Sequence, residues 1–425
     1  MAKVLTAPFA LPPSNSLRAL DRLNFFLAGL QAGFGPFVAI HLADRGWEPA
    51  SIGFVLTAGG VAGLLTQLPA GELLDLVQSK RALVGAASSV VALAALILAL
   101  SPNFSSVFAA SVLQGATGGV LGLGVTAITM GLVEHKAIAE RFGRNQRFAS
   151  LGGLAAAGIM GLIGDLLSTQ DIFFASAAFD VPVLLALVAI RTTDIHYGRS
   201  CGAADHHSTR LPRVRRPALF RDRRLLVFAS SLFLFQLANA SLLPLAGEAL
   251  ARVEGRRSSL VLSALIVFPQ ILVALFAPWA GRTADSWGRR PLLLLGLGIV
   301  PIRSLAFATT ADPVLLVAVQ ALDGITGAVL VVLTSLVIAD ITRGSGRFNL
   351  AQGVIGTLSG VGASLSTSLS GIAVEKFGHT VGFLGVAAIA LASVVVLWAF
   401  MPETKPPPVH APRPRSQRKG RGREP

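Results

Sequence analysis

The stretch GRTADSWGRRP, residues 281–291, places charged side chains between two long apolar runs. Its glycines, Gly281 and Gly288, allow the backbone to turn tightly. The charges fall where helix ends leave unpaired backbone groups that charged side chains stabilise. The stretch therefore predicts a short charged turn between two apolar helices. Its charged residues are Asp285, Arg289 and Arg290.

The composition indicates a membrane protein. Of the 425 residues, 53% are hydrophobic and 14% are charged, and the mean hydropathy is +0.67. This is more apolar surface than one soluble domain of this length buries. Helical spans of the roughly 30 Å hydrocarbon layer need about 20 apolar residues, and such runs recur along the whole chain. We expect an all-α integral membrane protein with twelve transmembrane helices.

The positive charge of the chain is explained by topology. The net charge is +14, and with a cytoplasmic amino terminus 30 of the 36 Lys and Arg residues fall on the cytoplasmic side. This asymmetry follows the positive-inside rule, so we expect contact with the lipid bilayer and none with nucleic acid. We predict a multi-pass protein of a bacterial inner membrane with both termini cytoplasmic.

The predicted spans divide the chain into five parts. The segment between the sixth and seventh spans is rich in Arg, His, Pro and Ser, which is typical of a solvated polar loop. Its Cys201, His206 and His207 fit no zinc-binding spacing, so no metal site and no cofactor is expected. The parts are a cytoplasmic segment (1–19), a six-helix half (20–190), a cytoplasmic linker (191–224), a second six-helix half (225–401) and a disordered basic tail (402–425).

The second half repeats the first. The stretch GELLDLVQSKR, Gly71 to Arg81, is a degraded copy of residues 281–291, in which Asp75 precedes Asp285 by 210 residues and Lys80 lies where an arginine is expected. GATGGVL at 115–121 matches GITGAVL at 324–330, an offset of 209. A third match, between 25–36 and 233–244, has an offset of 208. Such consistent spacing indicates a duplicated six-helix unit.

The loop pattern of Gly, three residues, Asp, two residues and Gly-Arg-Arg resembles the signature of the major facilitator superfamily of secondary transporters. Together with the repeat, the resemblance covers about residues 18–402. It implies two parallel six-helix halves, with the substrate site near the bilayer midplane between them and transport by alternating access. It also implies a cavity lined mainly by spans one, four, seven and ten.

Polar residues fall near mid-depth in those four spans. About ten residues of helix, roughly 15 Å of rise, reach the bilayer midplane. We interpret these residues as candidates for binding a polar or zwitterionic solute, with interhelical hydrogen bonding as the alternative for each amide. The midplane residues are Gln31, Gln114, Gln236 and Asp323, and their neighbours on the same helix faces are Thr117, Asn239 and Gln320.

Three ionisable residues within spans differ in their expected roles. Asp323 is the leading candidate for proton coupling or for binding a cationic group, because an ionised carboxylate at the bilayer centre is costly unless it faces water or a partner. A structural role is the alternative. Asp180 precedes Pro182 and is expected to accept a backbone N–H freed by that proline. Arg303 is expected to extend its side chain toward the outer interface.

The resemblance places the two loop motifs at a cytoplasmic gate. Asp285 would face the start of span five, near Arg144, Asn145 and Arg147, and Asp75 would face the start of span eleven, near Arg347 and Asn349. A carboxylate at a helix amino terminus gains from the free N–H groups there. Topology-setting charge is the alternative. The candidate gate residues are Gly71, Asp75, Lys80, Arg144, Gly281, Asp285, Gly288, Arg289, Arg290 and Arg347.

These observations predict a secondary active transporter of a small polar organic solute. We expect proton linkage and a monomer, with export slightly favoured by analogy with other members of the family. Uptake symport and uniport are the alternatives within transport, and a non-transporting receptor is the alternative outside it. An enzyme is not expected, because the seven histidines lie mostly in loops and tails and none pairs with a carboxylate at helical spacing within a span.

Overall fold

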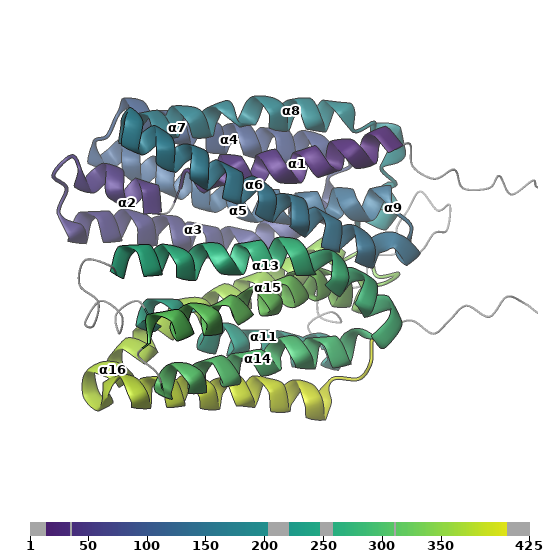
Figure 1. Cartoon of the computed structure of the whole chain (residues 1–425). Coiled ribbons are helices and arrows are strands. Elements are labelled where there is room, and N and C mark those ends of the chain that lie inside the picture. The colour runs from purple at the N-terminus through teal and green to yellow at the C-terminus, as the bar shows by residue number, and fades with distance from the viewer. Residues whose placement is uncertain (1–13, 35, 203–220, 247–257, 310–311, 406–425) are drawn as a thin grey trace, which may run out of the picture.

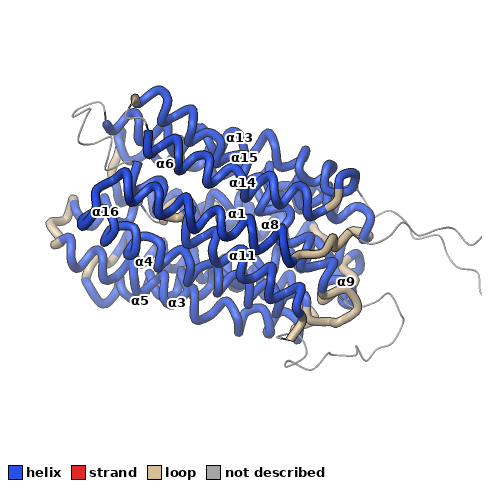
Figure 2. The backbone as a smooth tube through the Cα atoms, turned by 90° about the horizontal axis from the view of Figure 1, so that it is seen from below, coloured by secondary structure: helices blue, strands red, loops and turns tan. Residues whose placement is uncertain are grey.

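The computed structural model describes residues 14–34, 36–202, 221–246, 258–309 and 312–405. Within these ranges the chain forms helices joined by short loops, and no strand is present (Figure 2). The predicted all-α membrane fold is therefore confirmed. Ten helical segments of this part of the chain are long and apolar enough to cross a membrane.

The first half of the chain occupies one side of the bundle, coloured purple to teal in Figure 1. Two of its predicted spans are each broken into two helices. Its helices are α1 (Ser14–Ala32), α2 (Pro36–Ala43), α3 (Pro49–Leu76), α4 (Lys80–Leu100), α5 (Phe104–Leu132), α6 (Ile138–Leu166), α7 (Thr169–Ala178) and α8 (Asp180–Ala189), with a 3-10 turn at His135–Ala137.

The second half lies beside the first, coloured green to yellow. Its last helix, 53 residues long, would extend about 80 Å if straight, far beyond a bilayer. It is broken at Gly378, whose φ of 83° lies outside the helical region. The twelve-span count is still a prediction. The helices are α11 (Arg223–Asn239), α13 (Ser258–Trp287), α14 (Arg289–Thr309), α15 (Pro313–Ile341) and α16 (Phe348–Phe400).

Asp180 begins α8 at the break in the sixth predicted span. Its Oδ2 accepts a hydrogen bond from Ser89 Oγ of α4 at 3.0 Å, and its side chain is buried. The expected contact with a backbone N–H is therefore wrong. The aspartate instead connects a peripheral helix to α4.

Glycines allow the helices of each half to approach closely. A Cβ at Gly152 of α6 would lie 2.0 Å from the backbone oxygen of Phe25 in α1, so α1 and α6 are in backbone contact there. The adjacent Gly153 faces open space, with no atom within 4 Å of a Cβ built on it. The two neighbours thus differ in whether any side chain fits.

The halves meet along two helix pairs, α3 with α16 and α6 with α13. A Cβ at Gly71 would lie 2.3 Å from Asn349 O, and one at Gly281 would lie 2.3 Å from Ala139 O. Both glycines of the repeated loop motif therefore occupy equivalent positions against a helix of the opposite half. These contacts lie at the end of the bundle that is predicted to be cytoplasmic.

Replacing Gly152 by alanine is expected to lower the midpoint of thermal unfolding by several degrees. The added methyl group forces α1 and α6 apart, and overpacking of this kind costs about 1–3 kcal/mol. Gly153→Ala is the matched control, because it adds helix propensity worth about 0.5–1 kcal/mol without a contact. Equal midpoints for the two purified variants would contradict this packing.

Candidate functional site

Two adjacent cavities lie where the halves meet. The first, of about 490 Å³, is lined mostly by α1, α3, α5 and α6, and the second, of about 590 Å³, mostly by α11, α15 and α16. Both volumes are typical of small-molecule sites. The two cavities share a wall that contains residues of both halves, so a solute between them contacts both. The shared residues are Gln67, Leu123, Val331, Ser335 and Gln352.

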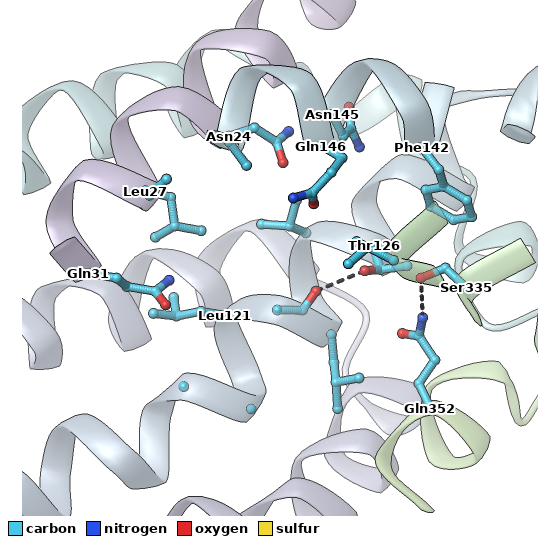
Figure 3. A pocket seen from close by; sticks show the side chains of 18 of the residues that line it. Asn24, Leu27, Gln31, Leu121, Thr126, Phe142, Asn145, Gln146, Ser335 and Gln352 are labelled. Carbon is cyan, nitrogen blue, oxygen red and sulfur yellow. Dashed lines mark hydrogen bonds between the residues drawn. The ribbon is translucent and has the colours of Figure 1, made fainter. Parts of the chain in front are cut away.

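The structure brings four of the seven midplane candidates to these cavities. Gln31 lines the first cavity (Figure 3), and Gln236, Asn239 and Asp323 line the second. The other three line neither. Thr117 donates its hydroxyl hydrogen to Leu113 O of its own helix at 2.8 Å, Gln320 is buried behind Asp323, and Gln114 is in neither lining.

Arg303 is the centre of a buried polar cluster beside the second cavity. It is 1% exposed, and its Nη1 donates to Asp323 Oδ1 at 2.5 Å and to Asn239 Oδ1 at 2.9 Å. Its Nη2 donates to Gln320 Oε1 at 2.7 Å. The prediction that Arg303 extends toward the outer interface is wrong. Three of the predicted site residues are instead connected through this one guanidinium.

Asp323 is the charged member of the cluster that lines the cavity. Its side chain is 29% exposed and faces the second cavity, whereas the side chain of Arg303 is 1% exposed. A buried cation depends on its anionic partner, because a lone charge in a low-dielectric interior is costly. Loss of the negative charge on Asp323 would therefore leave the buried Arg303 cation without its anionic partner.

Three polar residues of the shared wall were not predicted. Gln67, Ser335 and Gln352 lie on α3, α15 and α16, and Gln352 Nε2 donates to Ser335 Oγ at 3.0 Å (Figure 3). Only Ser335 belongs to one of the four spans searched by depth. A search for amides on the helices that join the halves would have found the other two.

The carboxylate of Asp75 is bound to the first turn of α16. Asp75 is 1% exposed, and its oxygens accept from Asn349 Nδ2 at 2.8 Å, Asn349 N at 3.3 Å and Leu350 N at 2.9 Å. The two backbone N–H groups, of Asn349 and Leu350, are among those that a helix leaves unpaired at its start. We call these contacts the Asp75 latch. Arg347 lies at the N-cap of the same helix.

Part of the predicted linker packs against this latch. Tyr197 in the short helix α9 (Tyr197–Ser200) donates its hydroxyl hydrogen to Asp75 O at 2.8 Å, and Ser200 O accepts from Asn349 Nδ2 at 3.0 Å. Cys201 is fully buried, and its carbonyl accepts from Phe348 N at 3.1 Å. The expectation of a solvated polar loop is therefore wrong for residues 200–202, which are buried. His206 and His207 lie outside the described residues.

Lys80 supports the latch from within the degraded motif. It is 1% exposed, donates from Nζ to Leu74 O and, at 2.7 Å, to Val77 O, and lies 4.7 Å from the ring centroid of Tyr197. Its charge thus stabilises the carbonyl groups at the end of α3. The lysine that departs from the family pattern is a buried part of this structure.

The complete motif does not form the predicted contact. Asp285 is 44% exposed at its side chain and pairs with Arg289, four residues along, at 3.0 Å. Arg144 pairs with Asp21 of α1 at 2.7 Å, and Asn145 donates to Thr129 Oγ1 at 2.7 Å. The side chains of Arg144 and Asn145 are therefore paired within their own half, and among the described residues Asp285 does not form the predicted contact with them.

Arg289 makes a different link across the halves. It is buried and donates from Nε to Asp340 Oδ2 at 2.9 Å, and His135 Nε2 of the first half lies 3.2 Å from Asp340 Oδ1. The complete motif therefore binds Asp340 of its own half, and the Asp340 carboxylate lies against His135 of the other half.

The residues after α16 hold the start of α14. Glu403 accepts from Arg289 N at 2.9 Å and from Arg290 N at 3.1 Å, beside Gly288 at a φ of 100°. Burial acts to raise the pKa of Glu403, but the backbone N–H groups of Lys405, Arg289, Arg290 and Thr404 hold this pKa below its ordinary value. Glu403 is thus exposed but hydrogen-bonded to the start of α14, so the prediction of a disordered tail is wrong for this residue, and residues 406–425 lie outside the described part of the chain.

The comparisons with known proteins agree with this fold. The family model of the Major Facilitator Superfamily matches residues 23–264 and 256–423. An uncharacterised MFS-type transporter of Mycobacterium tuberculosis is 35% identical over 400 residues, 93% of this chain and 95% of the relative. The chain belongs to the major facilitator superfamily and is a transporter of that family.

Solved structures with the same fold are more distant in sequence. The Escherichia coli fucose:proton symporter has a TM-score of 0.73 at 15% identity, covering 91% of this chain and 98% of that one. The human organic anion transporter MFSD10 has a TM-score of 0.70 at 16% identity, covering 91% of this chain and all of that one. At these identities the similarity concerns the fold alone.

Arg303→Met is expected to destabilise the protein by about 2–4 kcal/mol, because it leaves Asp323, Asn239 and Gln320 without their shared donor. The double variant Arg303→Met with Asp323→Asn should recover part of this loss, since no unpaired carboxylate is left. Unfolding midpoints of the single and double variants measure the coupling. Strictly additive losses would contradict the pairing.

Proposed function

We propose that the protein is a proton-linked secondary transporter of a small polar organic solute, with Asp323 as the proton-binding group. The observation that carries the proposal is the Asp323–Arg303 pair, in which a carboxylate that lines a cavity neutralises a fully buried arginine. Carboxylates within membrane spans are characteristic of proton pathways.

Protonation of Asp323 would remove the negative charge that pairs with Arg303 in this cluster. Arg303 would then have only neutral acceptors, namely Asn239, Gln320 and the uncharged carboxyl group of Asp323, and a buried cation with neutral partners is costly. The cluster would have to rearrange, and Arg303 links α14 to α11 and α15. Proton binding and helix movement in the second half are therefore coupled.

Alternating access would require the contacts at the predicted cytoplasmic end to open. The Asp75 latch and the Arg289–Asp340–His135 link join the halves there. In the inverted state both would be broken, and the cavities would open to the cytoplasm. The distribution of Lys and Arg supports a bacterial inner membrane with both termini cytoplasmic, and the proposal requires only a monomer.

Asp323→Asn is expected to abolish solute accumulation driven by a pH gradient, because the amide binds no proton at neutral pH. Solute exchange without a gradient should persist. A thermal-shift screen of the purified protein against metabolites and antibiotics supplies the solute, and proteoliposomes with gradients of either sign measure both the direction and the coupling. Asp285→Asn, which removes an exposed carboxylate outside the cavities, is the matched control. Undiminished accumulation by Asp323→Asn would contradict the proposed role.

A further inference from the structure

The amide of Gln352 has a polar atom without a partner. The residue is 7% exposed, its Nε2 donates to Ser335 Oγ, and its Oε1 is buried with no hydrogen-bond partner among the described residues. Because the Ser335 hydroxyl both donates and accepts, it satisfies one amide atom in either amide orientation and leaves the other unpaired. A buried polar atom that has lost its water and gained no partner destabilises the protein. Figure 3 shows this amide at the cavity wall.

A second unpaired amide lies on the opposite side of the seam between the halves. Gln67 Oε1 of α3 is also buried without a partner in the described part of the chain. A Cβ at Gly356 would lie 2.3 Å from this oxygen, and one at Gly353 would lie 2.6 Å from the backbone oxygen of Gln67. The glycines of α16 thus make room for the Gln67 side chain at the wall that both cavities share.

The first cavity contains polar groups without charge. Eight of the nineteen residues that line it are Asn, Gln, Ser or Thr, and none is Lys, Arg, His, Asp or Glu. A charged solute would lose hydration there without gaining an opposite charge, which is strongly unfavourable. The second cavity has one charged lining residue, Asp323, and this carboxylate is already paired with the buried Arg303. The first cavity therefore favours a neutral solute that forms many hydrogen bonds.

We propose that Gln67, Ser335 and Gln352 form a solute subsite across the seam, and that the solute is neutral and carries several hydroxyl groups. The proposal rests on the transport function proposed above and adds the class of solute. A hydroxyl group both donates and accepts, so it pairs with the free atom of each amide whichever way the amide is turned. Solute recognition and proton binding then use separate groups, with recognition at the seam and the proton at Asp323.

Binding can be tested without transport. The purified full-length protein is heated in detergent with myo-inositol or D-xylose, which are neutral polyols, and with gluconate or glucosamine, which carry a charge. We expect one or both polyols to raise the unfolding midpoint and the charged compounds to leave it unchanged. A midpoint raised by gluconate or glucosamine and by neither polyol, or by no compound at all, would overturn the proposal.

Variants locate the binding. Gln352→Leu and Gln67→Leu should each weaken polyol binding about tenfold or more, the effect of losing one hydrogen bond worth roughly 1.4 kcal/mol. Gln114→Leu removes an amide outside both cavities and should bind as the unmodified chain does. Polyol affinity that is unchanged in both Gln67→Leu and Gln352→Leu would refute the subsite.

A charge change gives a second readout that does not depend on loss of binding. Gln352→Glu places a carboxylate in the subsite. Glucosamine should therefore raise the unfolding midpoint of this variant, and myo-inositol should raise it less than it does in the unmodified chain. If it responds to myo-inositol as the unmodified chain does, the subsite is wrong. Asp323→Asn separates the two proposals, because Asp323 is the proposed proton-binding group and is not one of the three subsite residues. Retained binding with undiminished proton coupling in that variant would refute the proposed role of Asp323 and leave the subsite intact.

Discussion

The structure depends on a buried carboxylate at the amino terminus of a helix. Asp75 is removed from water, and three N–H groups from the first turn of α16 replace its hydration. Hydrogen bonds to a charged group contribute about 1.5–3 kcal/mol each, so this one side chain contributes strongly to holding the two halves together. Gly71 provides the close approach, and Lys80 and α9 cover the site.

The same helix connects this contact with the cavities. Gln352 lies three residues after Asn349, so the first turns of α16 carry both the latch and the unpaired amide of the seam. Movement of α16 away from α3 would separate Asp75 from its donors and Gln67 from its place against Gly356. A solute bound at the seam and a closed latch therefore depend on the same helix pair.

The fold was predictable from the sequence because it follows from hydropathy, loop charge and the internal repeat. The depth of Asp323 was also predictable from helical rise. The role of Arg303 was not predictable, because its partners lie on other helices. The position of Arg303 along its own span indicated the membrane interface, whereas Asn239, Gln320 and Asp323 bind it inside the bundle. Similarly, the loop motif at residues 281–291 matches the family pattern better, but the closer contact between the halves is the Asp75 latch. Asn349 and Leu350 offer free N–H groups, whereas α6 continues from a 3-10 turn in which Ile138 N already donates to His135 O.

The single cysteine of the chain provides the most direct test of the Asp75 latch. Cys201 is fully buried beside Asp75 and Lys80, and burial raises the pKa of its thiol, so little reactive thiolate is present at neutral pH. The rate of maleimide labelling of Cys201 in the folded protein should therefore be low. Asp75→Ala should increase this rate about tenfold or more, because the loss of one hydrogen bond lowers the free energy of local opening by roughly 1.4 kcal/mol. Asp285→Ala should leave it unchanged. If Cys201 is labelled as slowly in Asp75→Ala as in the unmodified protein, Asp75 does not hold the two halves together.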